Sequence, residues 1–154
     1  MKLVLLLFPL LLAAQMLHVG DSITPATLED QYEAEHKIGN ERYWIITWDK
    51  ESTHMINTYF EAHPNTLKDQ NAAMLVDVSQ IPSAIFSLFV KPRLKDYKHP
   101  ILLSFDTEYN RALPYQEGTV TLLELNKGVI RAITFVADEA ALAKALPEVA
   151  KKDL

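Results

Sequence analysis

The chain of 154 residues contains no cysteine. It can therefore form no disulfide, and packing alone must stabilise its fold. The same absence removes the thiolate nucleophile on which thiol chemistry depends. The chain is long enough for one hydrophobic core of ordinary size, and it shows no internal repeat and no low-complexity linker. We expect one folded domain.

The first fifteen residues form a separate segment. Lys2 precedes an unbroken apolar run from Leu3 to Leu12, and small and polar residues follow at Ala13 to Gln15. This layout is typical of a secretory signal, and the apolar run is too short for the roughly 20 residues that span a bilayer. We predict a signal peptide over residues 1–15 and a domain over residues 16–154, with no stable membrane insertion after cleavage. The alternative is an uncleaved N-terminal anchor.

The charges of the chain are mixed along its length. The formal net charge is −5, and acidic and basic residues are interspersed. A nucleic-acid-binding protein would need a basic stripe that follows the phosphates, and the sequence contains none. We therefore predict that nucleic acid is not a partner.

Strand-like and helix-like segments alternate in the first half of the sequence, and a hairpin and a helix follow. The run from Arg42 to Trp48 is continuous in aromatic and β-branched residues, which is typical of a strand buried on both faces. Asn126 to Gly128 suits a hairpin turn, and Asp138 suits a helix N-cap. The order predicts an α/β fold with a mixed central sheet and helices on both faces. The predicted strands cover residues 42–48, 72–78, 101–105, 120–125 and 129–135, and the predicted helices cover residues 52–60, 82–90 and 138–146.

This order resembles the thioredoxin-like superfamily, in particular its exported peroxiredoxin and TlpA-type branch. The opening Val19-Gly20-Asp21, with Pro25 and then Leu28 to Gln31, is similar to the start of that branch. Ile81-Pro82-Ser83 followed by Phe89-Val90 resembles the small periplasmic proteins called YtfJ-like, which also lack a redox pair. The resemblance implies a thioredoxin-like three-layer sandwich and, together with the signal, a periplasmic or secreted protein.

Both halves of the redox site of that superfamily are missing. Active members open the helix after the first core strand with two cysteines, and here that stretch runs from Asp49 to Met55. Active members also place a cis-proline before the hairpin, whereas this chain has no proline between Glu117 and Thr121. We therefore expect a member without thiol-disulfide activity.

Other chemistry in the same stretch has weak support. Ser52 and His54 are two residues apart, so on a helix their side chains point about 200° apart and do not form a nucleophile–base pair. Ser52 or Thr53 is better explained as the helix N-cap. His54 either binds a ligand or is an exposed side chain without a specific role.

The sequence predicts no metal site and no cofactor. No two of the five histidines are three or four residues apart, and the closest group of ligand types is Asp49, Glu51 and His54. Residues 21–30 lack the regular acidic spacing of a calcium loop. A solvated charged loop explains these residues better.

The aromatic residues allow two interpretations. Trp44 and Trp48 are four residues apart on a strand, so they point to the same face. Both fill the core, or Trp48 lies partly in the crevice where open α/β sheets bind ligands. The segment from Pro82 to Tyr97 carries aromatic residues and a small basic cluster, and it either covers the core or offers a partner surface.

We expect the surface left by the missing redox site to bind a protein or peptide non-covalently, with an exported protein or peptide as the partner. The alternative is a hydrolytic or small-molecule-binding protein that holds a small anion at the start of the helix near Ser52. The candidate binding residues are Trp48, Ser52, Thr53, His54, Glu117, Gly118 and Thr119.

Overall fold

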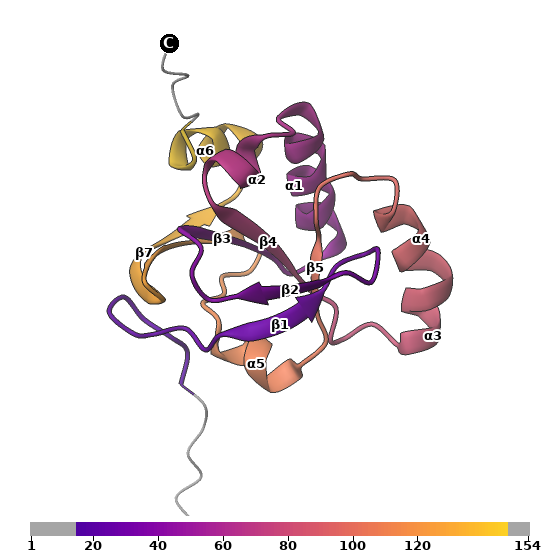
Figure 1. Ribbon diagram of the computed structural model, residues 1–154, viewed down its shortest axis with the longest axis horizontal. Helices are drawn as coiled ribbons and strands as arrows, with labels where there is room; N and C mark the ends of the chain where they lie inside the picture. Colours follow the sequence, from indigo (N-terminus) through magenta and orange to yellow (C-terminus); the bar gives the residue numbers. More distant parts are fainter. Residues whose placement is uncertain (1–14, 148–154) are drawn as a thin grey trace, which may run out of the picture.

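A seven-stranded mixed sheet forms the centre of the molecule in the computed structural model, which describes residues 15–147 (Figure 1). The strand order is β2-β1-β5-β4-β3-β6-β7. β3, β4 and β5 run parallel, and their outer neighbours are antiparallel. The strands are β1 (Ala26–Glu29), β2 (Glu35–Ile38), β3 (Tyr43–Thr47), β4 (Ala72–Asp77), β5 (Leu102–Ser104), β6 (Val120–Asn126) and β7 (Val129–Val136).

The predicted hairpin is present. β6 and β7 pair along their length, and Lys127 and Gly128 adopt φ angles of 50° and 78° in the turn between them. A two-residue turn with positive φ matches the right-handed twist of the flanking strands. Glycine adopts positive φ angles more readily than any other residue, which explains Gly128.

Helices cover both faces of the sheet, as the sequence predicts. Figure 1 shows α1 and α6 on one side and α5 on the other. The first face buries side chains of α1, α6, η1 and α4, and the second buries side chains of α5 and of the N-terminal segment around Ile23. The helices are α1 (Lys50–Ala62), α2 (Thr66–Asp69), α3 (Ser83–Ile85), the π-helix η1 (Phe86–Val90), α4 (Lys91–Leu94), α5 (Thr107–Ala112) and α6 (Glu139–Ala145).

The start of α1 corrects one expectation. Asp49, and not Ser52 or Thr53, is the N-cap: its backbone is extended, and its Oδ1 accepts from the N–H of Ser52 at 2.7 Å. Ser52 is the third residue of the helix and completes a capping box by accepting from the Asp49 N–H. The carboxylate at Asp49 reaches the exposed helix N–H groups, whereas the Thr53 hydroxyl turns inward.

Four elements, β1, β2, α2 and α5, were not predicted, and one helix continues beyond its predicted end. β2 pairs with β1, and α5 follows β5 with Asp106 as its N-cap. The helix expected over residues 82–90 continues through α3, η1 and α4 to Leu94. Pro92 has no N–H to donate to the preceding turn, which explains why the helix widens into a π turn just before it.

No helix within residues 15–147 combines the length and the apolar character needed to cross a membrane.

Candidate functional site

The carboxyl ends of the three parallel strands meet at one edge of the sheet. Trp48 follows β3, Ser79 lies just beyond β4, and Phe105 follows β5. In open α/β sheets, ligands bind outside this edge. The residues there define the candidate site, which we call the Trp48 corner: Trp48, Asp49, Ser52, Thr53, His54, Tyr115, Glu117, Gly118 and Thr119.

Trp48 is held in one orientation by β6 and by the loop that precedes it. Its indole Nε1 donates to the Thr121 hydroxyl at 3.1 Å, and that hydroxyl donates to the Pro114 carbonyl at 2.6 Å. The Tyr115 ring meets Trp48 edge-on, with 5.2 Å between the ring centroids. Both partners lie about seventy residues further along the chain, Tyr115 in the loop before β6 and Thr121 in β6 itself, so the fold alone creates these contacts.

The two tryptophans share a face of the sheet, as predicted, but not an environment. Trp44 is completely buried, whereas Trp48 is half-buried and packs at the margin of the same cluster. Tyr115 remains 48% exposed, so the pair presents an aromatic surface to solvent. Sequence reasoning missed Tyr115 because no local pattern marks a tyrosine in a polar loop as the neighbour of a distant tryptophan.

The hydroxyl groups at the start of α1 are occupied. Thr53 is buried, donates to the Asp49 carbonyl at 2.6 Å and shares a hydrogen bond of 2.8 Å with Thr47. Ser52 belongs to the capping box, and no hydrogen bond joins it to His54, which is exposed. The corner therefore contains no nucleophile with a base beside it.

The Asp49 carboxylate changes what the helix N-terminus can bind. An uncapped N-terminus attracts anions through its free N–H groups and its dipole. Here the carboxylate accepts from the Ser52 N–H and places a negative charge at that position. A small anion at Ser52 would compete with this side chain and be repelled by it.

The loop before β6 forms a closed turn. Thr119 is buried, and its N–H and its hydroxyl both donate to the Gln116 carbonyl, at 3.2 and 2.8 Å. Gly118 has φ 74°, and both it and Glu117 are exposed. No peptide bond within residues 15–147 is cis. Of the seven predicted residues, Thr53 and Thr119 thus support the corner from inside, and the others reach its surface.

No group of three or more potential metal ligands occurs within the described range. Two hollows of about 300 and 600 Å³ lie at the opposite end of the strands, where Glu41 and Asn71 line both. They are remote from Trp48, because Asn71 precedes the first residue of β4.

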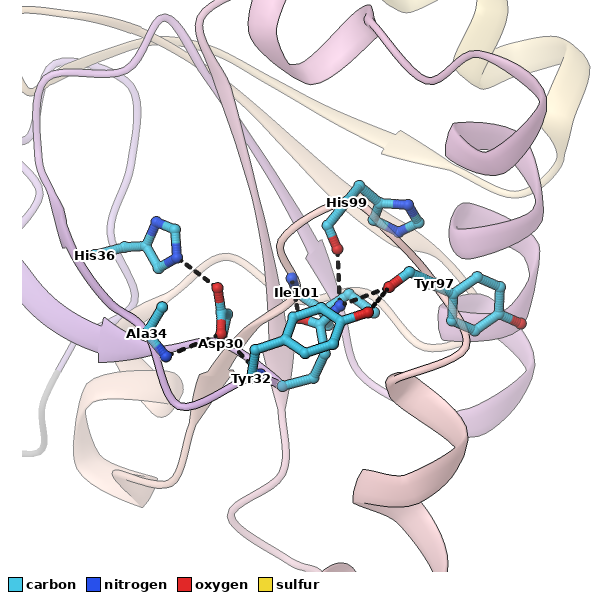
Figure 2. A network of polar contacts seen from close by, with 8 residues as sticks. Asp30, Tyr32, Ala34, His36, Tyr97, His99 and Ile101 are labelled. Atoms are coloured by element: carbon cyan, nitrogen blue, oxygen red, sulfur yellow. Dashed lines mark hydrogen bonds and ion pairs between the residues drawn. The ribbon is translucent and has the colours of Figure 1, made fainter.

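A second polar cluster, which we call the Gln31 network, lies beneath the β1–β2 turn (Figure 2). The Gln31 side chain is fully buried; it donates to the carbonyls of Tyr97 and His99, at 3.2 and 2.8 Å, and accepts from the Ile101 N–H at 2.8 Å. His99 Nε2 contacts Asn57 Oδ1 at 2.8 Å, which ties the loop to α1. Burial lowers the pKa of His99 to about 4.

Asp30 anchors the turn beside this network. Figure 2 shows its carboxylate between His36 and the N–H groups of Tyr32 and Ala34. Burial on its own would raise the pKa of Asp30, but these hydrogen bonds and the His36 charge outweigh it and lower the pKa. The hydrogen bonds of the turn are all made within the turn or to other parts of the domain, so these groups stabilise the fold.

Comparison with known proteins gives a result at the level of fold. No family model matches the chain, and no curated protein is significantly similar to it. Peroxidoxin BcpB from Mycobacterium tuberculosis superposes with a TM-score of 0.56 at 11% identity, covering 84% of this chain and 95% of that one. A protein assigned as the thiol:disulfide interchange protein DsbE from Chlorobium tepidum gives 0.58 at 13% identity, covering 84% and 93%.

A third structure, assigned as a protein disulfide isomerase from Bacteroides thetaiotaomicron, gives a TM-score of 0.58 at 10% identity and covers 86% of this chain and 88% of that one. Identities this low establish shared architecture and leave activity open. The mixed sheet, its helical layers and these superpositions agree with the fold expected from the sequence. The chain has the thioredoxin-like fold and carries none of the cysteines on which thiol-disulfide chemistry depends.

Proposed function

We propose that the protein is an exported, redox-inactive thioredoxin-fold module that binds an extended segment of another exported protein non-covalently at the Trp48 corner. The observation that carries the proposal is the Trp48–Tyr115 pair. Its tryptophan is fixed by Thr121, and its tyrosine is about half exposed. Rigid aromatic side chains at a surface lose little conformational entropy on binding and often provide most of the affinity of an interface.

The chemistry of the corner favours binding over catalysis. The chain has no thiol, and the hydroxyls of Ser52 and Thr53 are committed to the helix start. The Asp49 carboxylate disfavours the small anion that the alternative function requires. Non-covalent binding of a neutral or basic peptide segment needs no nucleophile, and the Asp49 carboxylate does not repel such a segment.

Each candidate residue has a place in this proposal. Trp48 and Tyr115 contact apolar side chains of the segment, and the exposed backbone at Gly118 offers it hydrogen bonds. Ser52, His54 and Glu117 form a polar rim, in which Glu117 favours a basic residue of the segment. Thr53 and Thr119 act from inside by holding the helix start and the loop in position.

A peptide selection tests this function. A library of random 12-residue peptides is selected on the wild-type protein, and enriched peptides are titrated against wild type, Tyr115→Ala and Tyr32→Ala. Tyr32 is the matched control, because it is also 48% exposed but lies at the Gln31 network. We expect the affinity to fall about tenfold or more for Tyr115→Ala and to stay unchanged for Tyr32→Ala. Equal affinity for all three proteins would place binding elsewhere.

Export is the second part of the proposal, and residues 1–14 lie outside the part of the chain that the structure describes. The run from Leu3 to Leu12 and the following Ala13-Ala14 support removal of the segment during secretion. The intact mass of the natively produced protein should show the loss of about fifteen residues. A full-length chain that stays in the membrane fraction would contradict export with cleavage.

A further inference from the structure

A second surface, independent of the Trp48 corner, carries the most exposed apolar side chains of the helical layer. Ile85, Leu88 and Phe89 lie on the helical run from α3 into η1 and are 46%, 68% and 59% exposed. Phe105, which is 54% exposed, joins them through its edge-on contact with Phe86, at 5.1 Å between the ring centroids. We call Ile85, Leu88, Phe89 and Phe105 the apolar ridge.

The ridge is on the opposite face of the sheet from Trp48. Phe86, whose ring contacts Phe105, belongs to the core cluster shared with α1. Trp48 packs against the core cluster of the other face. Figure 1 shows α3 and α4 at the side of the molecule, away from α5. Within residues 15–147, between 46% and 68% of each of these side chains stays exposed. Single apolar side chains at a surface are ordinary, but a contiguous group of them marks an interaction site.

The helical spacing of the ridge indicates the shape of its partner. Ile85, Leu88 and Phe89 stand at positions i, i+3 and i+4, which form the kind of ridge that packs into the groove of another helix. The π turn of η1 lies in this stretch, closed by a bond from the Lys91 N–H to the Phe86 carbonyl. π turns are rare and occur frequently at functional sites.

Charges of opposite sign flank the two ends of the ridge. Arg93, Lys95 and Lys98 are exposed beyond its carboxyl end and outnumber the one exposed carboxylate among them, Asp96, whereas Lys91 is already paired with Glu33. Asp106 and Glu108, both exposed, directly follow Phe105. An apolar centre with a polar rim of mixed sign is typical of a protein interface, and the two carboxylates would oppose an anionic lipid surface.

We infer that the apolar ridge docks an amphipathic helix of a partner protein, with apolar residues along one stripe, carboxylates at the end that meets Arg93 and Lys95, and a basic residue at the end near Asp106. The apolar stripe contributes the affinity, and the charges fix the direction of the helix. This inference does not depend on the function proposed for the Trp48 corner.

The test uses a display library of 16-residue helical peptides with leucine fixed at i, i+3, i+4 and i+7 and the other positions randomised. It is selected on wild type and counter-selected on Leu88→Asp. We expect enriched peptides with acidic residues at one end and basic residues at the other, and an affinity about tenfold lower for Leu88→Ala and Phe89→Ala. The charge reversal Arg93→Glu should weaken binding and change the selected end from acidic to basic.

Val19→Ala is the matched control, because Val19 is an apolar side chain with 60% exposure outside the ridge. It should leave the affinity unchanged, and so should Tyr115→Ala, which separates this surface from the Trp48 corner. Three outcomes would overturn the inference. They are no enrichment over Leu88→Asp, co-sedimentation with phosphatidylglycerol vesicles that Leu88→Ala abolishes, and self-association in sedimentation velocity that Leu88→Ala abolishes.

Discussion

The Gln31 network and the Trp48 corner are built from similar residues but differ in what they leave available. In the network, the groups of a buried glutamine bond to the backbone of a neighbouring loop, so no polar atom remains for a ligand. In the corner the hydroxyls of Ser52, Thr53 and Thr119 are equally committed, but Tyr115 and the margin of Trp48 remain exposed. The described part of the chain contains no buried side-chain polar atom without a partner.

This difference separates a structural cluster from a binding cluster. Groups whose bonds all end inside the domain contribute to folding, and aromatic surface that is held rigid and left open is suited to a partner. Substitutions in the network should therefore change stability, and substitutions in the corner should change binding. The predictions below test this division, beginning with the largest effect.

Gln31→Ala should lower the free energy of unfolding by about 3 kcal/mol. It leaves the His99 carbonyl and the Ile101 N–H unpaired in the interior, removes one of the two donors to the Tyr97 carbonyl, and creates a cavity in place of the amide. Urea denaturation followed by far-UV circular dichroism measures the change. Gln116→Ala removes an exposed glutamine and should be close to neutral. A loss under 1 kcal/mol for Gln31→Ala would mean that the network does not hold the fold.

His99 should make the protein less stable in acid. Its pKa in the folded protein is about 4, below the ordinary value of 6.5, so the unfolded chain binds a proton more readily. The contribution of neutral His99 to stability is therefore fully present above pH 6.5 and is lost as the pH falls from 6.5 toward 4. The full shift corresponds to about 3 kcal/mol, and we expect roughly 2 because solvent reaches part of the ring.

Denaturation of wild type and His99→Gln at pH 7, 6, 5 and 4 isolates this contribution. Glutamine is neutral at every pH and retains a donor for Asn57. The difference between the two proteins should shift in favour of the variant as the pH falls. Parallel pH profiles for wild type and variant would show that His99 is not responsible.

The sequence predicted the sheet well because its strands are local patterns. The run at β3 is apolar on both faces, and it is buried at every position. β2 was missed because Glu35–Ile38 shows no apolar alternation, and its pairing depends on the turn in which Glu33 adopts φ 66°. α5 was missed because it is six residues long and mostly polar, so only the Asp106 cap marked it.

The candidate site was predicted less completely, because its geometry joins distant segments. Trp48 lies at the end of its strand as expected, and its role as a binding residue stays a prediction, whereas Tyr115 reaches it only through the fold. The N-cap was placed on hydroxyl residues, although Asp49 with Ser52 three residues later carries both partners of the capping box. The burial of Gln31 left no trace in the sequence, since glutamine is usually exposed.

Trp48→Ala should have an intermediate effect on stability, about 1.5 kcal/mol. A fully buried tryptophan would cost 3–5 kcal/mol, but Trp48 is only half-buried and lies at the margin of its cluster. The change also leaves the Thr121 hydroxyl with one partner fewer. Chemical denaturation gives the loss, and Trp44→Phe provides a fully buried comparison with a smaller change in volume. A loss above 3 kcal/mol would assign Trp48 to the core rather than to the corner.

Tyr115→Ala should change stability least, by under about 0.5 kcal/mol, because the side chain is about half exposed and its hydroxyl bonds to nothing in the described structure. It should nevertheless redden the fluorescence of Trp48, since the indole loses the ring that packs against it. Tyr115→Phe keeps the ring and should retain both the emission and the peptide affinity. A Tyr115→Ala protein that unfolds at a clearly lower denaturant concentration than wild type would assign this tyrosine to the fold rather than to the binding surface. Unchanged fluorescence would mean that the contact between Trp48 and Tyr115 does not persist in solution.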